Sequence, residues 1–282
     1  MEIQWYPGHM KKTFQTLKSD LKLVDVVIRL LDARIPRSSN NPLLEEMLVN
    51  KCNIIVLNKS DISDSNINQE WVSYYQHNGL NAVLTDSVNG TGFQKIKVIL
   101  KEAVESRAQA EAIKGRLPRP IRAMVVGITN VGKSAFINRI TGSSAAIAGE
   151  RPGLTRGRQW IRLNPEFEIM DTPGVLWPDL KVGNAGMNLA LTGAINDNRF
   201  DITDAILYLI QTIEDSYPGN FINRYKIKNS YDKENIIKLL EEAGRNRGCI
   251  ISGGVVDINR ISIVILDEFR GGKLGRITLE RP

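Results

Sequence analysis

The chain has 282 residues and a net charge of +6, with 42% apolar and 24% charged residues, as in ordinary globular proteins. No apolar run approaches the roughly 20 residues that cross a bilayer, and residues 1–10 lack the apolar core of an export signal, so we expect a cytoplasmic protein. Two widely separated cysteines, Cys52 and Cys249, argue against a disulfide framework and a zinc site. Both lie beside apolar strand-like residues, which predicts that they are small core residues.

Along the first half of the chain, apolar strand-like runs alternate with helical stretches. After a basic helix that ends near residue 22, the expected strands are residues 24–31, 53–57, 82–84 and 121–126. The expected helices between and after them are residues 43–49, 67–77, 93–112 and 134–140. Strands separated by helices predict parallel βα units in an α/β sandwich, with ligands bound at the carboxyl ends of the strands. Residues 159–163 and 167–170 add a hairpin.

The pattern changes after residue 179, which predicts an α/β domain over residues 1–179 and a helical domain over residues 180–282. In the second domain, apolar residues recur at helical spacing after Asp232, a suitable N-cap. We expect that helix to stop at Gly244 and the next one to span residues 258–269.

The sequence Gly127-Ile-Thr-Asn-Val-Gly-Lys-Ser134 matches GxxxxGK[ST] and stands between an expected strand and an expected helix. In such a loop the backbone amides wrap the β-phosphate, Lys133 neutralises the β/γ oxygens, and the Ser134 hydroxyl binds Mg²⁺. The alternative, a chance turn, leaves this flanking context unexplained. The residues expected to contact the nucleotide here are Asn130, Val131, Gly132, Lys133, Ser134 and Ala135.

The tetrapeptide Asn58-Lys-Ser-Asp61 follows the second expected strand and indicates which base is bound. The Asp61 carboxylate can accept hydrogen bonds from the ring N–H and the exocyclic amine of guanine, whereas adenine offers no such donor pair. At ~1.5–3 kcal/mol for each charge-assisted bond, the discrimination is ~10²–10⁴. Lys59 can lie over the base plane, and Asn58 can tie this loop to the P-loop. Alone, such a tetrapeptide often makes a turn or a helix cap; beside a P-loop it predicts guanine.

Three further motifs complete the expected site. Asp171-Thr-Pro-Gly174 follows a strand, so Asp171 fits the Mg²⁺ shell through a water and the Gly174 amide fits the γ-phosphate, although a plain tight turn has the same composition. Thr155 is expected to close on Mg²⁺ when a γ-phosphate is present. Ser87 and Val88 are expected to place backbone amides near the guanine oxygen.

The motif order is NKSD, TDSV, GITNVGKS, PGLT and DTPG, so the guanine-reading motif precedes the phosphate loop. This order resembles the circularly permuted GTPases of the YlqF/YawG group, which are translation-factor-like P-loop GTPases. The resemblance extends over nearly the whole chain, including the segments Trp5-Tyr-Pro-Gly-His-Met10, Asp32-Ala-Arg-Ile-Pro36 and Asp171-Thr-Pro-Gly-Val-Leu-Trp-Pro178. It implies a permuted GTPase sandwich with a mostly parallel sheet over residues 1–179 and an all-helical C-terminal domain. It also implies GTP/GDP and Mg²⁺ as ligands, and a role in late assembly of the bacterial large ribosomal subunit.

The permutation cuts the chain just after DTPG, where the second switch of a GTPase leads into the helical domain. One hypothesis is that the γ-phosphate contact at Gly174 biases the orientation of that domain. The alternative is a rigidly packed domain that ignores the nucleotide.

The residue after DTPG is Val175, where many GTPases carry a glutamine that orients the attacking water. Valine has no group for this task, so we expect slow intrinsic turnover that the ribosomal partner stimulates. His9 is the best internal candidate for the catalytic group, beside Lys133 and Gly174. Stacking on Trp5 or binding to RNA explains this histidine equally well.

Asn130 resembles the asparagine by which some family members hold K⁺ near the phosphates, and an ordinary loop-closing role is the alternative. Residues 114–163 contain ten Lys/Arg and one acid, so the segment is either a solvated surface or a site for a polyanion such as RNA. From residue 181 onward, 14 Lys/Arg face 13 Asp/Glu, which favours no particular ligand.

These observations favour a monomeric GTPase that acts on the large ribosomal subunit or its precursor, through rRNA and ribosomal proteins, without a membrane or DNA partner. A GTP-gated, RNA-binding scaffold with negligible turnover is the alternative. An RNA-modifying enzyme is disfavoured, because the sequence shows no nucleophilic Cys/His arrangement and no second cofactor motif.

Overall fold

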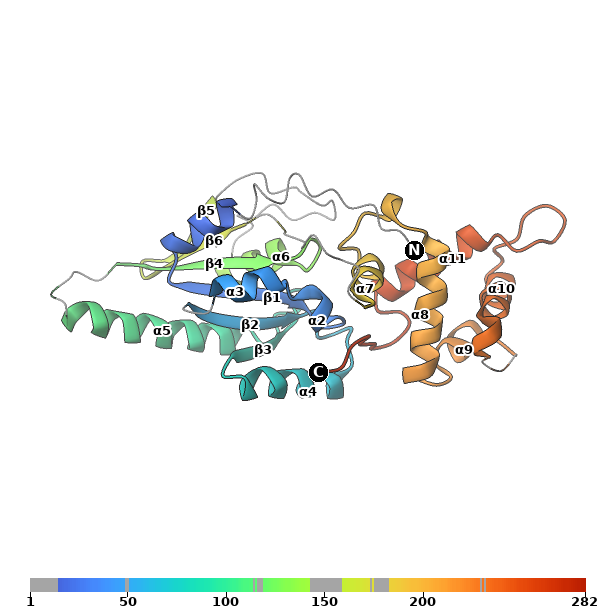
Figure 1. Cartoon of the computed structure of the whole chain (residues 1–282), viewed down its shortest axis with the longest axis horizontal. Helices are drawn as coiled ribbons and strands as arrows, with labels where there is room; N and C mark the ends of the chain where they lie inside the picture. The colour runs from blue at the N-terminus through green and yellow to red at the C-terminus, as the bar shows by residue number, and fades with distance from the viewer. Residues whose placement is uncertain are drawn as a thin grey trace.

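The computed structural model describes residues 15–48, 51–113, 115, 119–142, 159–172, 174, 183–228, 230 and 232–282. Among these residues, six strands form one sheet in the order β3-β2-β1-β4-β6-β5 (Figure 1). Their bounds are β1 (Val26–Asp32), β2 (Cys52–Asn58), β3 (Asn81–Thr85), β4 (Ile121–Gly127), β5 (Gln159–Asn164) and β6 (Phe167–Asp171). Only β5 is antiparallel to its neighbour, so the other five strands end at one edge of the sheet. The predicted α/β class with a mostly parallel sheet is confirmed.

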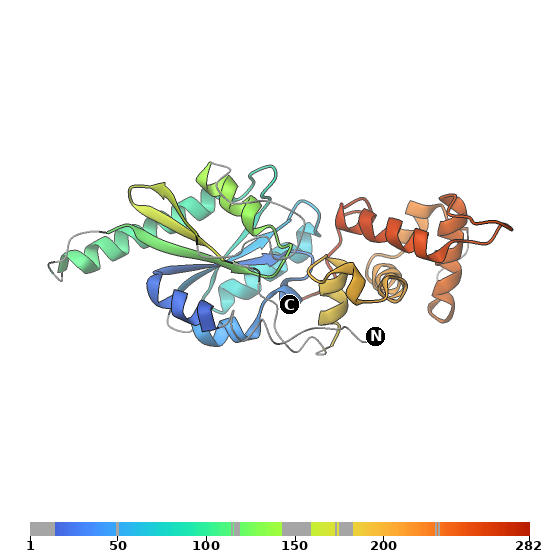
Figure 2. The ribbon, with the colours of Figure 1, turned by 90° about the horizontal axis from the view of Figure 1, so that it is seen from above.

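Helices cover both faces of the sheet (Figure 2). On one face, α5 (Phe93–Ile113) and α6 (Lys133–Thr141) pack on alternate residues of β1 such as Ile28 and Leu30. On the other face, α3 (Pro42–Leu48) and α4 (Ser65–His77) pack on the remaining apolar residues, including Val27 and Leu31. All seven residues of β1 are buried. Burial on both faces explains why the strands read as continuous apolar runs in the sequence.

From residue 183 onward, the regular elements that the structure describes are helices. The helices are α7 (Ala185–Leu191), α8 (Ile202–Ser216), α9 (Asn220–Tyr225), α10 (Ile236–Asn246) and α11 (Ile258–Arg270). Apolar side chains of α8, α10 and α11, among them Leu209, Leu240 and Ile265, form a separate core. The sequence predicts α10 and α11 but not α7, α8 or α9. None of the helices that the structure describes is long and apolar enough to span a bilayer.

The last residues of the chain return from the helical part to the sheet. Leu279 donates its N–H to the Arg34 carbonyl (2.8 Å), and Ile277 donates to the Ile62 carbonyl (3.3 Å). The Glu280 carboxylate accepts the backbone N–H groups at the start of α2 (Pro36–Ser39). The C-terminus therefore lies beside α2 and α4 (Figure 1).

Two local predictions are wrong. Cys52 is exposed, because it is the first residue of β2 and precedes the buried part of that strand; Cys249 is buried as predicted. Gly244 does not end its helix: α10 continues to Asn246, and the left-handed turn falls at Gly248 (φ 68°). Gly244 instead packs closely against the loop before α11. A Cβ at this position would overlap Cγ1 of Val256 in that loop.

Gly244→Ala should lower the free energy of unfolding by about 1–3 kcal/mol, although alanine is the better helix former, because the added methyl overpacks the contact with Val256. Chemical denaturation followed by circular dichroism measures this. Lys238→Ala, at an exposed position on the same helix, is the control and should change stability by less than about 0.5 kcal/mol. Equal stability of Gly244→Ala and the wild type would contradict the close packing of α10.

Candidate nucleotide-binding site

The P-loop lies between the end of β4 and the start of α6, at the carboxyl edge of the sheet. Two of its residues have left-handed backbone conformations: Gly132 (φ 96°) and Asn130 (φ 56°). A Cβ at Gly132 would also lie 2.5 Å from Nδ2 of Asn58, so glycine is required both for the turn and for the approach of the NKSD loop. Val131 is buried, whereas Ser134 and Ala135 are half-buried in the first turn of α6.

Lys133 is buried within this loop. Its Nζ donates to the carbonyl of Ile128 (2.8 Å) and approaches that of Gly127 (3.3 Å). Burial lowers the pKa of Lys133 to about 8, and the nearby negative charge of Asp171 only partly opposes this shift. An ammonium group held by two carbonyls and poorly solvated gains strongly from an anion, as expected of a phosphate-binding lysine.

Asn58 connects three motifs that are far apart in the sequence. Its Nδ2 donates to the Val131 carbonyl of the P-loop (2.8 Å). Its Oδ1 accepts from the hydroxyls of Ser87 (2.7 Å) and Thr85 (3.2 Å), at the end of β3. The neighbouring strands β2, β1 and β4 bring these loops to the same edge, so the permuted order along the chain does not prevent their assembly.

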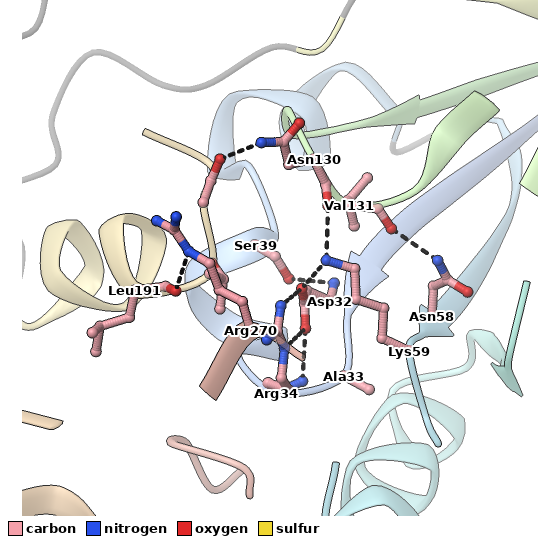
Figure 3. A network of polar contacts seen from close by, with 12 residues as sticks. Asp32, Ala33, Arg34, Ser39, Asn58, Lys59, Asn130, Val131, Leu191 and Arg270 are labelled. Atoms are coloured by element: carbon pink, nitrogen blue, oxygen red, sulfur yellow. Dashed lines mark hydrogen bonds and ion pairs between the residues drawn. The ribbon is translucent and has the colours of Figure 1, made fainter. Parts of the chain in front are cut away.

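Lys59 is fixed in a left-handed conformation (φ 63°) by contacts at its ammonium group. Its Nζ lies 3.0 Å from Oδ2 of Asp32 and 2.8 Å from the carbonyl of Asn130, as Figure 3 shows. Arg34 binds the same carboxylate through Nε (3.0 Å) and Nη2 (2.8 Å). Burial alone would raise the pKa of Asp32, but Arg34 and Lys59 hold it well below its usual range.

Sequence reasoning missed the part that Asp32 and Arg34 play at this site. The register of the sheet pairs Asp32 with Asn58, which places an acidic residue at the end of β1 directly beside the NKSD loop. The sequence does show an acidic residue, Asp32, at the carboxyl end of β1. Its closeness to the NKSD loop could not be inferred, because the sequence does not reveal that β1 and β2 are neighbours in the sheet.

The remaining predicted residues are placed as follows. Asp171 ends β6 and is buried, and the Thr172 hydroxyl donates to the Val125 carbonyl of β4 (2.7 Å). Gly174 lies against the P-loop, since a Cβ there would be 2.9 Å from the Thr129 backbone. Asp61 is half-buried after Lys59. His9, Thr155 and Val175 lie outside the described residues.

The residues after β3 form a hydrogen-bonded turn. The Val88 N–H donates to the Asp86 carboxylate (2.8 Å), as does the Asn89 N–H (3.0 Å). Aspartate side chains commonly form such turns with the backbone that follows them. The Val88 amide is therefore held in a local turn after β3, and the Val88 side chain is 78% exposed; the contact of this amide with guanine stays a prediction.

The oxygen-bearing side chains at this site are suited to binding Mg²⁺. Ser134 offers a hydroxyl and Asp171 a carboxylate, the hard oxygen ligands that Mg²⁺ prefers when phosphates complete its shell. The charge of Asp171 is close enough to influence Lys133, which places the carboxylate near the phosphate loop. No group of three or more His, Cys, Asp or Glu side chains suited to a metal occurs in the part of the chain that the structure describes.

A mostly parallel sheet with a P-loop, an NKSD loop hydrogen-bonded to it, and Gly174 of DTPG against the P-loop defines a circularly permuted P-loop GTPase. The sequence profile of a family described as 50S ribosome-binding GTPase matches residues 122–251. A Bacillus cereus protein named ribosome biogenesis GTPase A is 41% identical over 282 residues, covering all of this chain and 95% of the relative. The chain belongs to the ribosome biogenesis GTPase A family, and it is a GTP-hydrolysing enzyme.

Solved structures agree with this assignment. The GDP-bound structure of YlqF from Thermotoga maritima aligns with a TM-score of 0.68 at 26% identity, covering 95% of this chain and 99% of that one. The GNP-bound structure of YlqF aligns with a TM-score of 0.65 at 27% identity, covering 96% and 98%. The predicted resemblance to the YlqF group is confirmed, and guanine-nucleotide binding is supported.

The lowered pKa of Lys133 predicts pH-dependent nucleotide affinity. In the free protein the ammonium group loses its proton as the pH rises through about 8, and a bound phosphate restores it. GDP affinity should therefore fall by about fourfold between pH 7 and pH 8.5, with proton uptake on binding. Isothermal titration calorimetry in two buffers of different ionisation enthalpy measures both quantities. Binding at pH 8.5 without proton uptake would contradict this account.

Asp61→Asn should reverse the base preference. The amide donates where the carboxylate accepts, so GDP affinity should fall by ~10²–10⁴ while xanthosine diphosphate, which has a carbonyl in place of the exocyclic amine, gains. Competition binding measures the ratio. Asp64→Asn is the matched control, because Asp64 caps α4 and asparagine caps a helix equally well. The Asp64→Asn protein should keep the base preference of the wild type.

Proposed function

We propose that this GTPase assists late assembly of the large ribosomal subunit, in the cytoplasm and as a monomer. The observation that carries the proposal is the assembled site, with Asn58 joining the guanine-reading loop to the P-loop, in a chain related over its whole length to ribosome biogenesis GTPase A. The family profile adds the 50S subunit as the partner class. Binding to rRNA and ribosomal proteins, without a membrane or DNA partner, follows from that partner.

The proposed roles within the site follow the geometry. Lys133 neutralises the β/γ oxygens, Ser134 and Asp171 hold Mg²⁺, and the Gly174 amide faces the γ-phosphate. Thr155 closes on Mg²⁺ in the GTP state. Asp61 selects guanine, and Mg²⁺ when bound offsets the charge on the phosphates.

The group that positions the attacking water is proposed to be His9, ordered or completed by the ribosomal partner, because Val175 has no polar atom. K⁺ is proposed as a second cation at Asn130. What supports this is the fixed amide: Asn130 Nδ2 donates to the Gly193 carbonyl (2.6 Å), and Figure 3 shows the amide oxygen turned away from that bond.

The RNA-contacting surface is proposed to include the arginines around the first switch. Several other basic residues of segment 114–163 already have partners in the protein. Arg119 pairs with Asp25 (3.0 Å), and Arg122 pairs with Glu168 (3.2 Å). Exposed Lys and Arg residues of this segment without such partners would supply most of the salt-dependent affinity for RNA.

The test is GTP hydrolysis by the wild type and His9→Ala, alone and with purified large subunits, in KCl and in NaCl. Large subunits should raise the rate by roughly 10² or more, the contribution of general-base catalysis, and His9→Ala should lose most of that stimulation. Small subunits control for nonspecific RNA effects. Absence of stimulation would favour the GTP-gated scaffold, and equal rates in both salts would remove the K⁺ proposal.

A further inference from the structure

We propose that Asp32, Arg34 and Phe269 are positioning residues for guanine binding: they hold Lys59 in place for the base, and Phe269 makes that placement depend on the docked helical domain. The inference rests on guanine binding at the NKSD loop. It goes beyond the proposed function because it assigns the helical domain a part in nucleotide affinity.

Lys59 cannot hold its own geometry. Its left-handed backbone (φ 63°) costs free energy in a residue other than glycine, so contacts elsewhere must stabilise it. These contacts are the Asp32 carboxylate (3.0 Å) and the Asn130 carbonyl (2.8 Å), both at the ammonium end of the side chain. With that end fixed, the methylene stem spans the space between two loops, where a base plane can lie along it.

Asp32 is committed to this task. It is 1% exposed, and its carboxylate accepts hydrogen bonds from the backbone N–H and guanidinium of Arg34 and pairs with the Lys59 ammonium group. Arg34 and Lys59 hold this buried carboxylate in one position, because a desolvated charge is stabilised only while its charged partners stay in contact with it. Arg34 thus fixes Asp32, and Asp32 fixes Lys59.

The helical domain completes the unit from the other side. The Arg34 guanidinium lies over the Phe269 ring of α11, with Cζ 5.3 Å from the ring centroid. Nη1 of Arg34 is buried and has no hydrogen-bond partner among the residues that the structure describes, so the ring face is its stabilising neighbour. The Leu279 N–H also binds the Arg34 carbonyl (2.8 Å).

A second connection reaches Lys59 through the P-loop. Asn130, whose carbonyl accepts from Lys59, donates its side-chain amide to Gly193 just after α7. Arg270, next to Phe269, holds the same turn by donating to the carbonyls of Leu191 (3.1 Å) and Ala190 (2.9 Å), as Figure 3 shows in part. Consecutive residues of α11 therefore support both contacts of the Lys59 ammonium group.

This linkage involves the base and not the γ-phosphate. GDP and GTP should therefore stabilise docking of the helical domain equally, and loosening the domain should weaken both nucleotides by the same factor. A coupling through Gly174, in contrast, would affect the triphosphate alone.

The test is a double-mutant cycle on the full chain, with dissociation constants for GDP and a non-hydrolysable GTP analogue measured by calorimetry. Asp32→Asn should raise both constants by about tenfold, and Phe269→Leu by about threefold. In a Lys59→Ala background each of these changes should have less than about a twofold effect, because both act through Lys59. Phe269→Leu keeps the proposal testable if Asp32→Asn fails to fold.

Arg29→Met is the matched control. Arg29 is also buried on β1, but it binds Glu45 (3.1 Å) and Asn53 (3.2 Å) and is remote from Lys59. Arg29→Met should lower the melting temperature without changing either dissociation constant by more than about twofold. Additive effects of Asp32→Asn and Lys59→Ala, or a change confined to the GTP analogue, would overturn the proposal. Failure of the wild type to bind GDP would instead refute guanine binding at the NKSD loop.

Discussion

The site depends on one hydrogen bond between loops from two non-adjacent strands: the amide of Asn58 to the carbonyl of Val131. It sets the NKSD loop against the phosphate loop at a distance that requires glycine at position 132. The bond exists because β1 lies between β2 and β4, with all three parallel and in register. Spatial order in the sheet, not order along the chain, therefore builds the nucleotide site, which is why a permuted sequence can keep it.

The cluster around Asp32 extends this site toward the helical domain. Burying a carboxylate with two cations gains little net stability, because desolvation cancels most of the attraction. What it provides is a defined geometry, since moving Asp32 or Arg34 leaves buried charge uncompensated. The helical domain contacts that cluster at Arg34 and the P-loop at Asn130.

Much of the fold follows from the sequence because strands buried on both faces give unmistakable apolar runs. The motif residues of the phosphate loop and NKSD were likewise predictable, since each sits at the end of such a strand. Helices α7 and α9 were not, because they are short and have no side-chain cap. Helix α8 was missed although the Asp201 cap and the apolar spacing after it are visible in the sequence. The tertiary contact of Gly244 and the side-chain partners of Asp32 come from neighbours distant in the chain, and a single sequence does not reveal them.

The return of the last residues to the sheet has a consequence for synthesis. Glu280 accepts the N–H groups of Arg37 and Ser38 and the amide of Asn188 (2.8 Å), so it joins the first turn after β1 to α7. Residues near position 280 leave the ribosome after the rest of the described chain. The start of α2 therefore lacks its carboxylate partner until residue 280 has been made, and these contacts of α2 can form only after the helices that precede Glu280 in the sequence.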